Sequence, residues 1–245
     1  MAIPIDAWSA DSCRVSLFVL EPTNLTAAAV FHTLVGEPSS TESVDRKLGQ
    51  SVAAGPWNGG MLQIVFSVGR IDFLLTPEPP QVPEFVVLAP PVSQRFQELT
   101  AAVGSWYETS GAVCMRVAFG ARCLYSTPTV EESYKVLAAL VRTVRVDYAR
   151  FREMRFGVNY LGRSAVDAGA LINRLSTWSA ITLRRAVFAP SGGAVATGSD
   201  QYFCVCELDI NTDSERKEPL PPPSVSARIN ELREQAELVL TEGIE

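Results

Sequence analysis

The sequence predicts an α+β fold: a mostly antiparallel sheet with its helices on one face. Apolar, β-branched stretches follow one another through tight turns, as in hairpins, and helical patterns separate these groups of strands. The order strand, helix, strand, strand, helix over residues 14–107 recurs in similar form over residues 112–241, without any repeat of the residues themselves. We therefore expect two similar α+β halves, residues 1–110 and 111–245, as two domains or as one continuous domain.

The first half opens with a strand and a helix. Residues 14–20 (RVSLFVL) are apolar and β-branched, which favours a strand. Residues 25–35 (LTAAAVFHTLV) predict a short helix, with Thr23 or Asn24 as its N-cap. Residues 37–56 are polar and predict a loop.

A hairpin and a second helix complete the first half. The apolar stretches MLQIVFSV and IDFLLT flank the turn Gly69-Arg70, which is typical of a two-residue β-hairpin. Residues 77–85 are proline-rich and break regular structure. Apolar residues recur at helical spacing over residues 92–107, directly after Pro90-Pro91, and predict a helix there.

The second half begins with a strand over residues 112–119 (AVCMRVAF), whose hairpin partner ARCLYS follows Gly120. A helix over residues 130–144 is predicted next, because Ser126 to Thr129 supply capping residues and acidic residues lie in the first turn. Residues 154–161 (MRFGVNYL) predict another strand.

The remaining chain is predicted to contain two helices and two strands. Residues 165–178 (AVDAGALINRLSTW) predict a helix, and the stretches AITLRRAVFA and QYFCVCELDI predict strands. The last helix is expected over residues 225–240, where apolar residues again recur at helical spacing.

The net charge of −6 is distributed unevenly along the chain. Residues 1–115 carry 5 basic and 11 acidic side chains, residues 116–185 carry 12 and 5, and residues 186–245 carry 4 and 11. Either these segments pair inside the folded protein, or the basic middle forms a positive face for an acidic partner. Eleven of the twelve basic residues in the middle are arginine, which binds carboxylates and phosphates through two parallel hydrogen bonds.

Five arginines close together in the sequence are the candidate partner-binding residues. They are Arg142, Arg145, Arg150, Arg152 and Arg155, with Tyr148, Phe151 and Phe156 between them. We expect a protein partner, bound through an arginine-rich face or an exposed sheet edge. Nucleic acid is the alternative partner, since phosphates attract arginine and bases stack on aromatic rings. Asp147 and Glu153 interrupt the basic run and argue against that alternative.

The sequence favours a non-catalytic accessory protein over an enzyme. His32 is the only histidine, which excludes sites that need two, and the motifs of metalloproteases, α/β-hydrolases and phosphate-binding loops do not occur. The alternative is an enzyme acting on a small anionic or nucleotide substrate. Whether Asp209 and Asp213 would bind a divalent metal in that case stays open, and no cofactor is expected.

Cysteine usage predicts a reduced, cytoplasmic protein. The five cysteines are odd in number and lack the spacing of a disulfide framework, so each is expected to act as a small buried apolar residue. The first residues lack a basic segment followed by an apolar core, so no secretory signal is expected. No apolar run reaches the ~18 residues that span a bilayer, so no membrane association is expected.

Three stretches of the second half resemble one family of proteins. FGVNYLGR (156–163), CELDINTD (206–213) and ARINELREQAELVLTEGI (227–244) are similar to the closing half of uncharacterised bacterial proteins of about this length, which occur sporadically among genomes. Asn159-Tyr160 reverses the order of the family's Tyr-Asn, and Asn211 replaces its second Asp. The resemblance implies a bacterial cytoplasmic accessory protein that acts through partners, and it assigns no site residue.

Overall fold

The structure is a computed structural model of the 245-residue chain. It describes residues 2–20, 25–78, 90–147, 150, 153–184, 186–188, 194–196, 200–212, 216 and 218–244.

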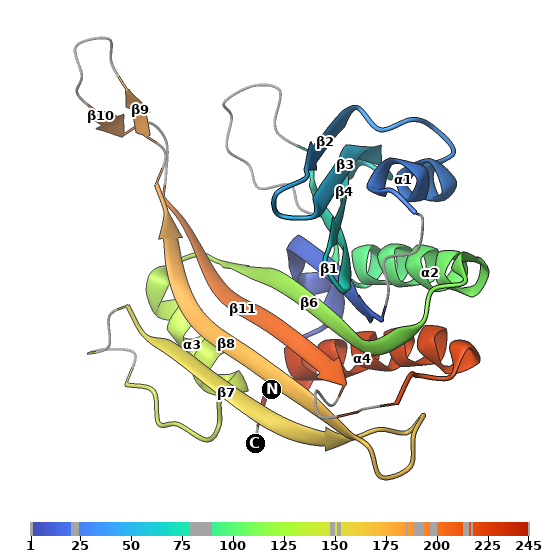
Figure 1. The fold of residues 1–245 in the computed structure, drawn as a ribbon. Helices are drawn as coiled ribbons and strands as arrows, with labels where there is room; N and C mark the ends of the chain where they lie inside the picture. The colour runs from blue at the N-terminus through green and yellow to red at the C-terminus, as the bar shows by residue number, and fades with distance from the viewer. Residues whose placement is uncertain are drawn as a thin grey trace.

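A nine-stranded antiparallel sheet runs through the molecule (Figure 1). Its strand order is β2-β3-β4-β5-β1-β6-β11-β8-β7. The strands are β1 (Ser9–Val19), β2 (Thr41–Asp45), β3 (Gln50–Trp57), β4 (Gly60–Ser67), β5 (Arg70–Pro77), β6 (Cys114–Thr127), β7 (Arg155–Arg163), β8 (Leu171–Leu183) and β11 (Gln201–Thr212). Two short strands, β9 (Ala186–Phe188) and β10 (Ala194–Ala196), pair with each other outside this sheet. The predicted α+β class with a mostly antiparallel sheet is confirmed.

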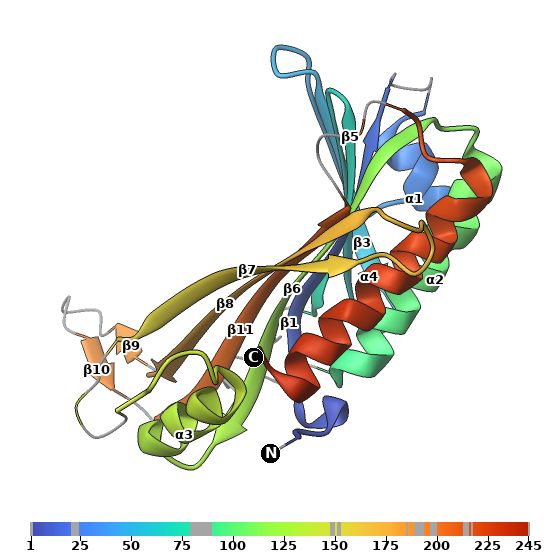
Figure 2. The ribbon, with the colours of Figure 1, turned by 90° about the horizontal axis from the view of Figure 1, so that it is seen from below.

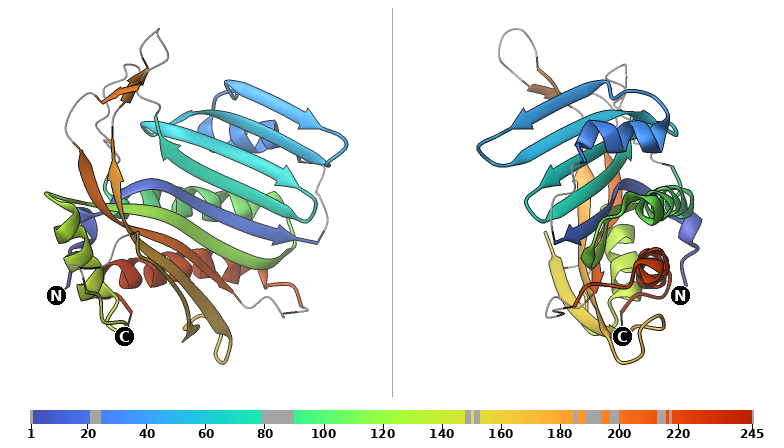
Figure 3. Two further views of the ribbon diagram at one scale, coloured as in Figure 1. Left: turned by 90° about the vertical axis from the view of Figure 1, so that its left-hand side faces the viewer. Right: turned by 45° about the vertical axis from the view of Figure 1, so that its right-hand side comes forward.

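The four described α-helices all lie on one face of the sheet (Figure 3). They are α1 (Ala27–Val35), α2 (Val92–Ser110), α3 (Val130–Leu140) and α4 (Pro222–Glu242), and a 3-10 turn, η1 (Ile5–Ala7), precedes β1. Side-chain alternation along the strands explains this arrangement: in β1, the buried side chains of Cys13, Val15 and Leu17 point to the helices, while Arg14 and Phe18 point to the other face.

One continuous apolar core fills the space between the sheet and the helices. Aromatic rings form much of it, with Trp8 against Trp178 at 6.2 Å between ring centroids and Phe96 against Phe119 at 4.7 Å. Each fully buried ring or branched side chain of this kind stabilises the fold by about 1.5–3 kcal/mol. Because Trp8 precedes the first strand and Trp178 lies in β8, this core joins the beginning of the chain to its second half.

Strands from both predicted halves belong to the same sheet. β1 pairs with β5 on one side and with β6 on the other, with Val15 opposite Phe73 and Phe119. Residues 1–110 and 111–245 therefore share an uninterrupted row of hydrogen-bonded strands.

Local signals place two helices as the sequence predicts. Thr129 caps α3 by accepting a hydrogen bond from the Glu132 amide at 3.2 Å, and α2 begins directly after Pro91. The N-cap of α1 is Thr26, which accepts from the Ala29 amide at 3.2 Å, whereas the predicted caps Thr23 and Asn24 lie outside the described residues. The hairpin of β4 and β5 is present, with its two-residue turn at Val68-Gly69 rather than at the predicted Gly69-Arg70.

Three predicted elements are wrong. The loop predicted over residues 37–56 contains the strands β2 and β3. The hairpin predicted at Gly120 is one continuous strand, β6. Gly120 is extended and pairs with strands on both sides, and the Arg14 side chain packs over it. The helix predicted over residues 165–178 is a short loop followed by β8, which pairs with both β7 and β11.

Candidate binding surface

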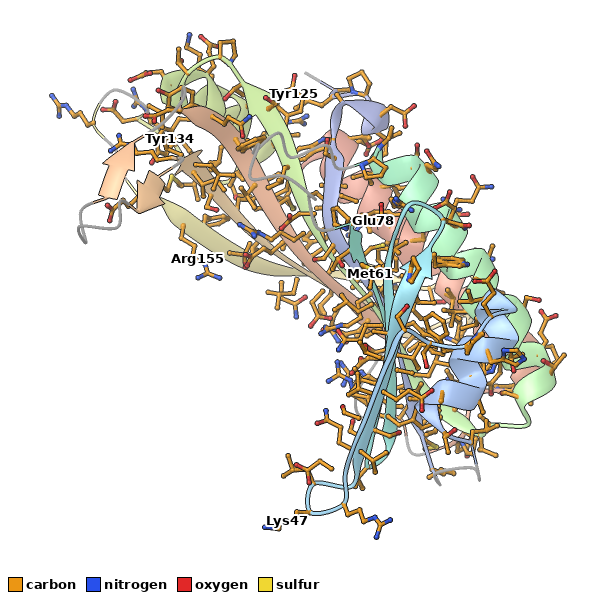
Figure 4. The ribbon with its side chains drawn as sticks, turned by 90° about the horizontal axis from the view of Figure 1, so that it is seen from above. Lys47, Met61, Glu78, Tyr125, Tyr134 and Arg155 are labelled. Atoms are coloured by element: carbon orange, nitrogen blue, oxygen red, sulfur yellow. The ribbon has the colours of Figure 1, made fainter. Side chains whose placement is uncertain are left out.

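No described helix covers the second face of the nine-stranded sheet, which we call the open face. The sheet bends, with β2, β3, β4, β5 and β1 on one side of the bend and β6, β11, β8 and β7 on the other. The open face is the inner, concave side of this bend (Figures 2 and 4). The tip of the β2–β3 hairpin, at Lys47, and Arg155 on β7 mark its two sides in Figure 4. Polar and charged side chains from the middle strands line it: Arg14, Ser16, Arg70, Asp72, Arg116, Arg122, Glu207, Asp209 and Asn211.

Phe18 lies on the open face, near the end of the middle strand β1, between two guanidinium groups. The Cζ atom of Arg116 lies 4.8 Å from the ring centroid, and that of Arg70 lies 5.3 Å from it. This follows from the register, because Phe18 stands opposite Arg70 on one side and opposite Arg116 on the other. A cation over an aromatic ring contributes about 0.5–1 kcal/mol at such partly exposed positions. The ring therefore holds both arginines in place.

Asp72 neutralises part of the positive charge beside this ring. It accepts hydrogen bonds at Oδ1 from Ser16 Oγ at 2.5 Å and from Arg70 Nε at 2.8 Å. The Nε atom of Arg14 lies 4.0 Å from the same oxygen, beyond hydrogen-bond distance. Ser16 is fully buried, so its hydroxyl needs this acceptor.

Acidic side chains also accompany the arginines on the second half of the sheet. Arg122 donates to Asp11 at 2.9 Å, and its Nε lies 3.8 Å from Glu207. Arg155 donates from Nη2 to Glu207 at 3.2 Å. Positive and negative groups thus alternate across the open face. Some arginines of the basic middle segment pair with acidic residues of the first and last segments inside the folded protein.

Three arginines of the open face have donors that the fold leaves unused. The Nε atoms of Arg14, Arg116 and Arg122 are buried and have no hydrogen-bond partner in the described structure. Arg14 donates no hydrogen bond to any described residue, and the residues opposite it are Leu74 on β5 and Gly120 on β6. A buried donor without an acceptor costs about 1–3 kcal/mol. The side chains of Arg14 and Arg122 are nevertheless 39% and 42% exposed, so the outer parts of their guanidinium groups can be reached by another molecule.

A shallow hollow of about 200 Å³ lies beside two of these arginines. Arg14, Arg122, Ser12 and Glu207 line it, and Gly120 lies at its base. A Cβ atom at Gly120 would lie 3.4 Å from Arg14 Nη2 and 3.3 Å from the Leu208 carbonyl oxygen. Glycine at this position therefore lets the Arg14 side chain lie close to the sheet.

Amide side chains extend the polar surface toward β7. Arg116 Nη2 donates to Asn211 Oδ1 at 2.7 Å, and Asn173 Nδ2 donates to the same oxygen at 3.2 Å. Asn159 Nδ2 in turn donates to Asn173 Oδ1 at 3.0 Å. Hydrogen-bonding groups thus run from β6 to the last strand of the sheet.

The structure distributes the five sequence-predicted arginines over separate places. Arg155 belongs to the open face, whereas Arg142 donates to the Glu242 carbonyl oxygen at 3.2 Å beyond the C-terminal end of α3. Arg145 is exposed in the segment after α3, and Arg150 lies 3.8 Å from Asp147. Arg152 lies outside the described residues.

The arginines that sequence reasoning missed lie far apart in the chain. Arg14, Arg70, Arg116 and Arg122 come from three different strands, and only the strand order β5-β1-β6 brings them together. The sequence feature that could have identified them is an alternation of polar and apolar residues within the strands: in RVSLFVL, residues 14–20, the polar residues Arg14 and Ser16 are two positions apart. Polar residues at that spacing indicate a sheet face that is not covered by the core.

Metal-ligand clusters are absent from the described residues, and the cysteine thiols are buried. No three His, Cys, Asp or Glu side chains gather there as a metal site would require, and Asp213 lies outside them. All five cysteines are free and buried, as predicted, and burial raises the pKa of Cys13, Cys114 and Cys204 to about 12. His32 is exposed on α1. No helix in the described part of the chain has the length and apolar character needed to cross a membrane.

The sequence matches no protein-family model and no curated protein.

Proposed function

We propose that the protein is a binding protein that captures an acidic partner protein on the open face of its sheet. The observation that carries this proposal is the group of arginines on the open face whose side chains stay partly exposed, with Arg14 at 39%, Arg70 at 33% and Arg122 at 42%. Aspartate and glutamate side chains of a partner would accept hydrogen bonds from the exposed parts of these guanidinium groups, in the bidentate geometry that arginine favours. The concave shape of the face adds contact area around these groups.

The distribution of charge favours a protein partner over nucleic acid. A phosphate backbone carries closely spaced negative charge and is best matched by a continuous basic surface. Here Asp72 and Glu207 lie among the arginines, and the whole chain carries a net charge of −6. Such alternation fits a protein segment whose carboxylates are separated by polar or apolar residues. An accessory role through partners also agrees with what the resemblance of the second half implies.

Capture of the partner from a native lysate by the tagged, full-length protein tests the proposal. We expect a stoichiometric acidic protein, identified by mass spectrometry, to bind the wild type and to be lost from the double variant Arg14→Gln, Arg122→Gln. Both side chains are about two-fifths exposed, so glutamine should change the melting temperature only slightly. The matched control is Arg46→Gln, Lys47→Gln at the exposed β2–β3 hairpin tip, which should retain the partner.

Two outcomes would contradict the proposal. Retention of the partner by the Arg14→Gln, Arg122→Gln variant, with affinity equal to that of the hairpin-tip control, would show that the open face does not bind it. Release of the bound material by nuclease would show that the ligand is nucleic acid rather than protein.

A further inference from the structure

β7 forms one edge of the sheet, and no described strand pairs with its outer side. Along the nine residues Arg155–Arg163, alternate residues thus point their backbone N–H and C=O groups away from β8, where another strand could use them. The opposite edge strand, β2, has the usual protection: it is five residues long and carries Glu42 and Asp45. β7 is longer and contains no acidic residue.

Apolar side chains are exposed beside β7 on the open face. Leu161 is 54% exposed, and the register places it opposite Asn173. Its diagonal neighbours on β8 are Leu171 and Leu175, which are 42% and 40% exposed. Diagonal neighbours in an antiparallel pair are close enough for long side chains to touch, so the three leucines form one patch at the sheet edge.

A hollow of about 260 Å³ lies on the other face of the same edge. Tyr160 lines it from β7, and Leu238, Val239 and Ile244 line it from α4 and the residues after it. The Cζ atom of Arg174 lies 4.4 Å from the centroid of the Tyr160 ring. Tyr160 is half exposed, so part of its ring is available to another side chain.

We propose that β7 accepts an extended segment of a partner protein as an added antiparallel or parallel strand. Side chains of an added strand alternate between the two faces of the sheet. One set would cover the leucine patch, and the other would enter the hollow beside Tyr160. Main-chain hydrogen bonds then give affinity, and the apolar sites on the two faces give sequence preference.

The two arginines at the ends of β7 indicate which charges the partner segment should carry. Arg155 and Arg163 lie at the two ends of β7, and the Arg163 side chain makes no ion pair or hydrogen bond with any described residue. An acidic residue near each end of the added strand would complement them. A second copy of β7 fits poorly, because antiparallel pairing centred on Asn159 would place Arg155 of one copy opposite Arg163 of the other.

Selection from a display library of random nine-residue peptides against the full-length protein tests this proposal. We expect enriched peptides with apolar residues at alternate positions and an acidic residue near at least one end. Leu161→Glu should weaken their binding by at least about tenfold. The matched control Val44→Glu, an exposed residue of the other edge strand, should leave it unchanged. Bound peptide should slow amide exchange over residues 155–163.

Two outcomes would overturn the proposal: that no peptide is enriched, or that the enriched peptides bind the Leu161→Glu and Val44→Glu variants equally well. A wild-type dimer that Leu161→Glu dissociates in sedimentation would show that a second copy occupies the edge instead. The inference is independent of the proposed function, because Arg14→Gln, Arg122→Gln should leave peptide binding at β7 intact.

Discussion

Arg116 donates from Nη2 to Asn211 Oδ1 at 2.7 Å, and this bond joins β6 to β11 on the open face across 95 residues of sequence. Asn211 is nearly buried, and the same guanidinium lies over the ring of Phe18. This part of the open face is therefore fixed by contacts that reach from β1 to β11.

Replacement of Arg116 by methionine should lower the free energy of unfolding by about 1–2 kcal/mol. The variant keeps an apolar stem but loses one hydrogen bond and the cation–π contact. Urea denaturation measures the change. The matched control is Arg155→Met. The Arg155 side chain is 71% exposed, and Glu207, which is half exposed, is its only ion-pair partner among the described residues, so the effect should stay below about 0.5 kcal/mol. Equal losses in the two variants would show that Arg116 contributes no more than a surface ion pair.

Asp167 should make stability depend on pH in the acid range. Hydrogen bonds from Arg228 and Arg216, both at 2.6 Å, hold the pKa of its carboxyl below the ordinary value of 3.8. The stabilisation is complete above the unfolded-state pKa and is lost as the pH falls from there through the lower folded-state pKa. Acid titration of unfolding should thus show a steeper loss below pH 3.8 for the wild type than for Asp167→Asn. Parallel curves would contradict this assignment.

The sequence predicts the elements whose signal is local and misses those that depend on the sheet. Capping residues and prolines mark α2 and α3, and they are found where expected. β8 is missed because Leu171, Leu175 and Trp178 recur at helical spacing, although only Trp178 points into the core. The two leucines face the other side, where the sheet is open. Exposed leucines on one face of the strand and a buried tryptophan on the other thus have the sequence spacing that normally indicates the buried face of a helix.

The candidate surface is harder to predict for a related reason. The sequence directs attention to arginines that are neighbours in the chain, between residues 142 and 155. The open face instead combines Arg14, Arg70 and Arg116, which meet only because β1 lies between β5 and β6. Strand order is a long-range property, and no local pattern in a single sequence determines it. Alternating polar residues in the strands indicate that an open face exists, but not which arginines share it.

The five cysteines should be unreactive in the folded protein. Burial raises the pKa of Cys13, Cys114 and Cys204 to about 12 and raises that of Cys123 and Cys206 well above the ordinary value. Since the thiolate is the nucleophile, a thiol-reactive chromogenic disulfide at about pH 8 should modify almost none of them. All five should react in concentrated guanidinium chloride. Rapid modification of one thiol in the native protein would disagree with the packing described for that cysteine.

Glu231 should control the stability of the β7 edge through the loop that joins β7 to β8. This carboxylate of α4 is nearly buried and accepts hydrogen bonds from Ser164 Oγ at 2.7 Å, from the Ala165 amide and from the Val166 amide at 3.3 Å. Glu231→Ala leaves these donors without their acceptor and should cost about 3 kcal/mol, because bonds to charged groups contribute about 1.5–3 kcal/mol each. The control Glu234→Ala, an exposed residue of the same helix, should cost less than about 0.5 kcal/mol.

Amide exchange distinguishes a local effect of Glu231 from general destabilisation. In Glu231→Ala, exchange should accelerate first over residues 164–170 and then along β7, while β3 and β4, at the other end of the sheet, keep their relative protection. Because β8 is the only described strand that pairs with β7, a loosened loop frees the end of β7 more readily than it would free a central strand. Binding of a β7-selected peptide should weaken in this variant even where the protein remains folded. Uniform acceleration across all strands would show instead that Glu231 supports the core as a whole.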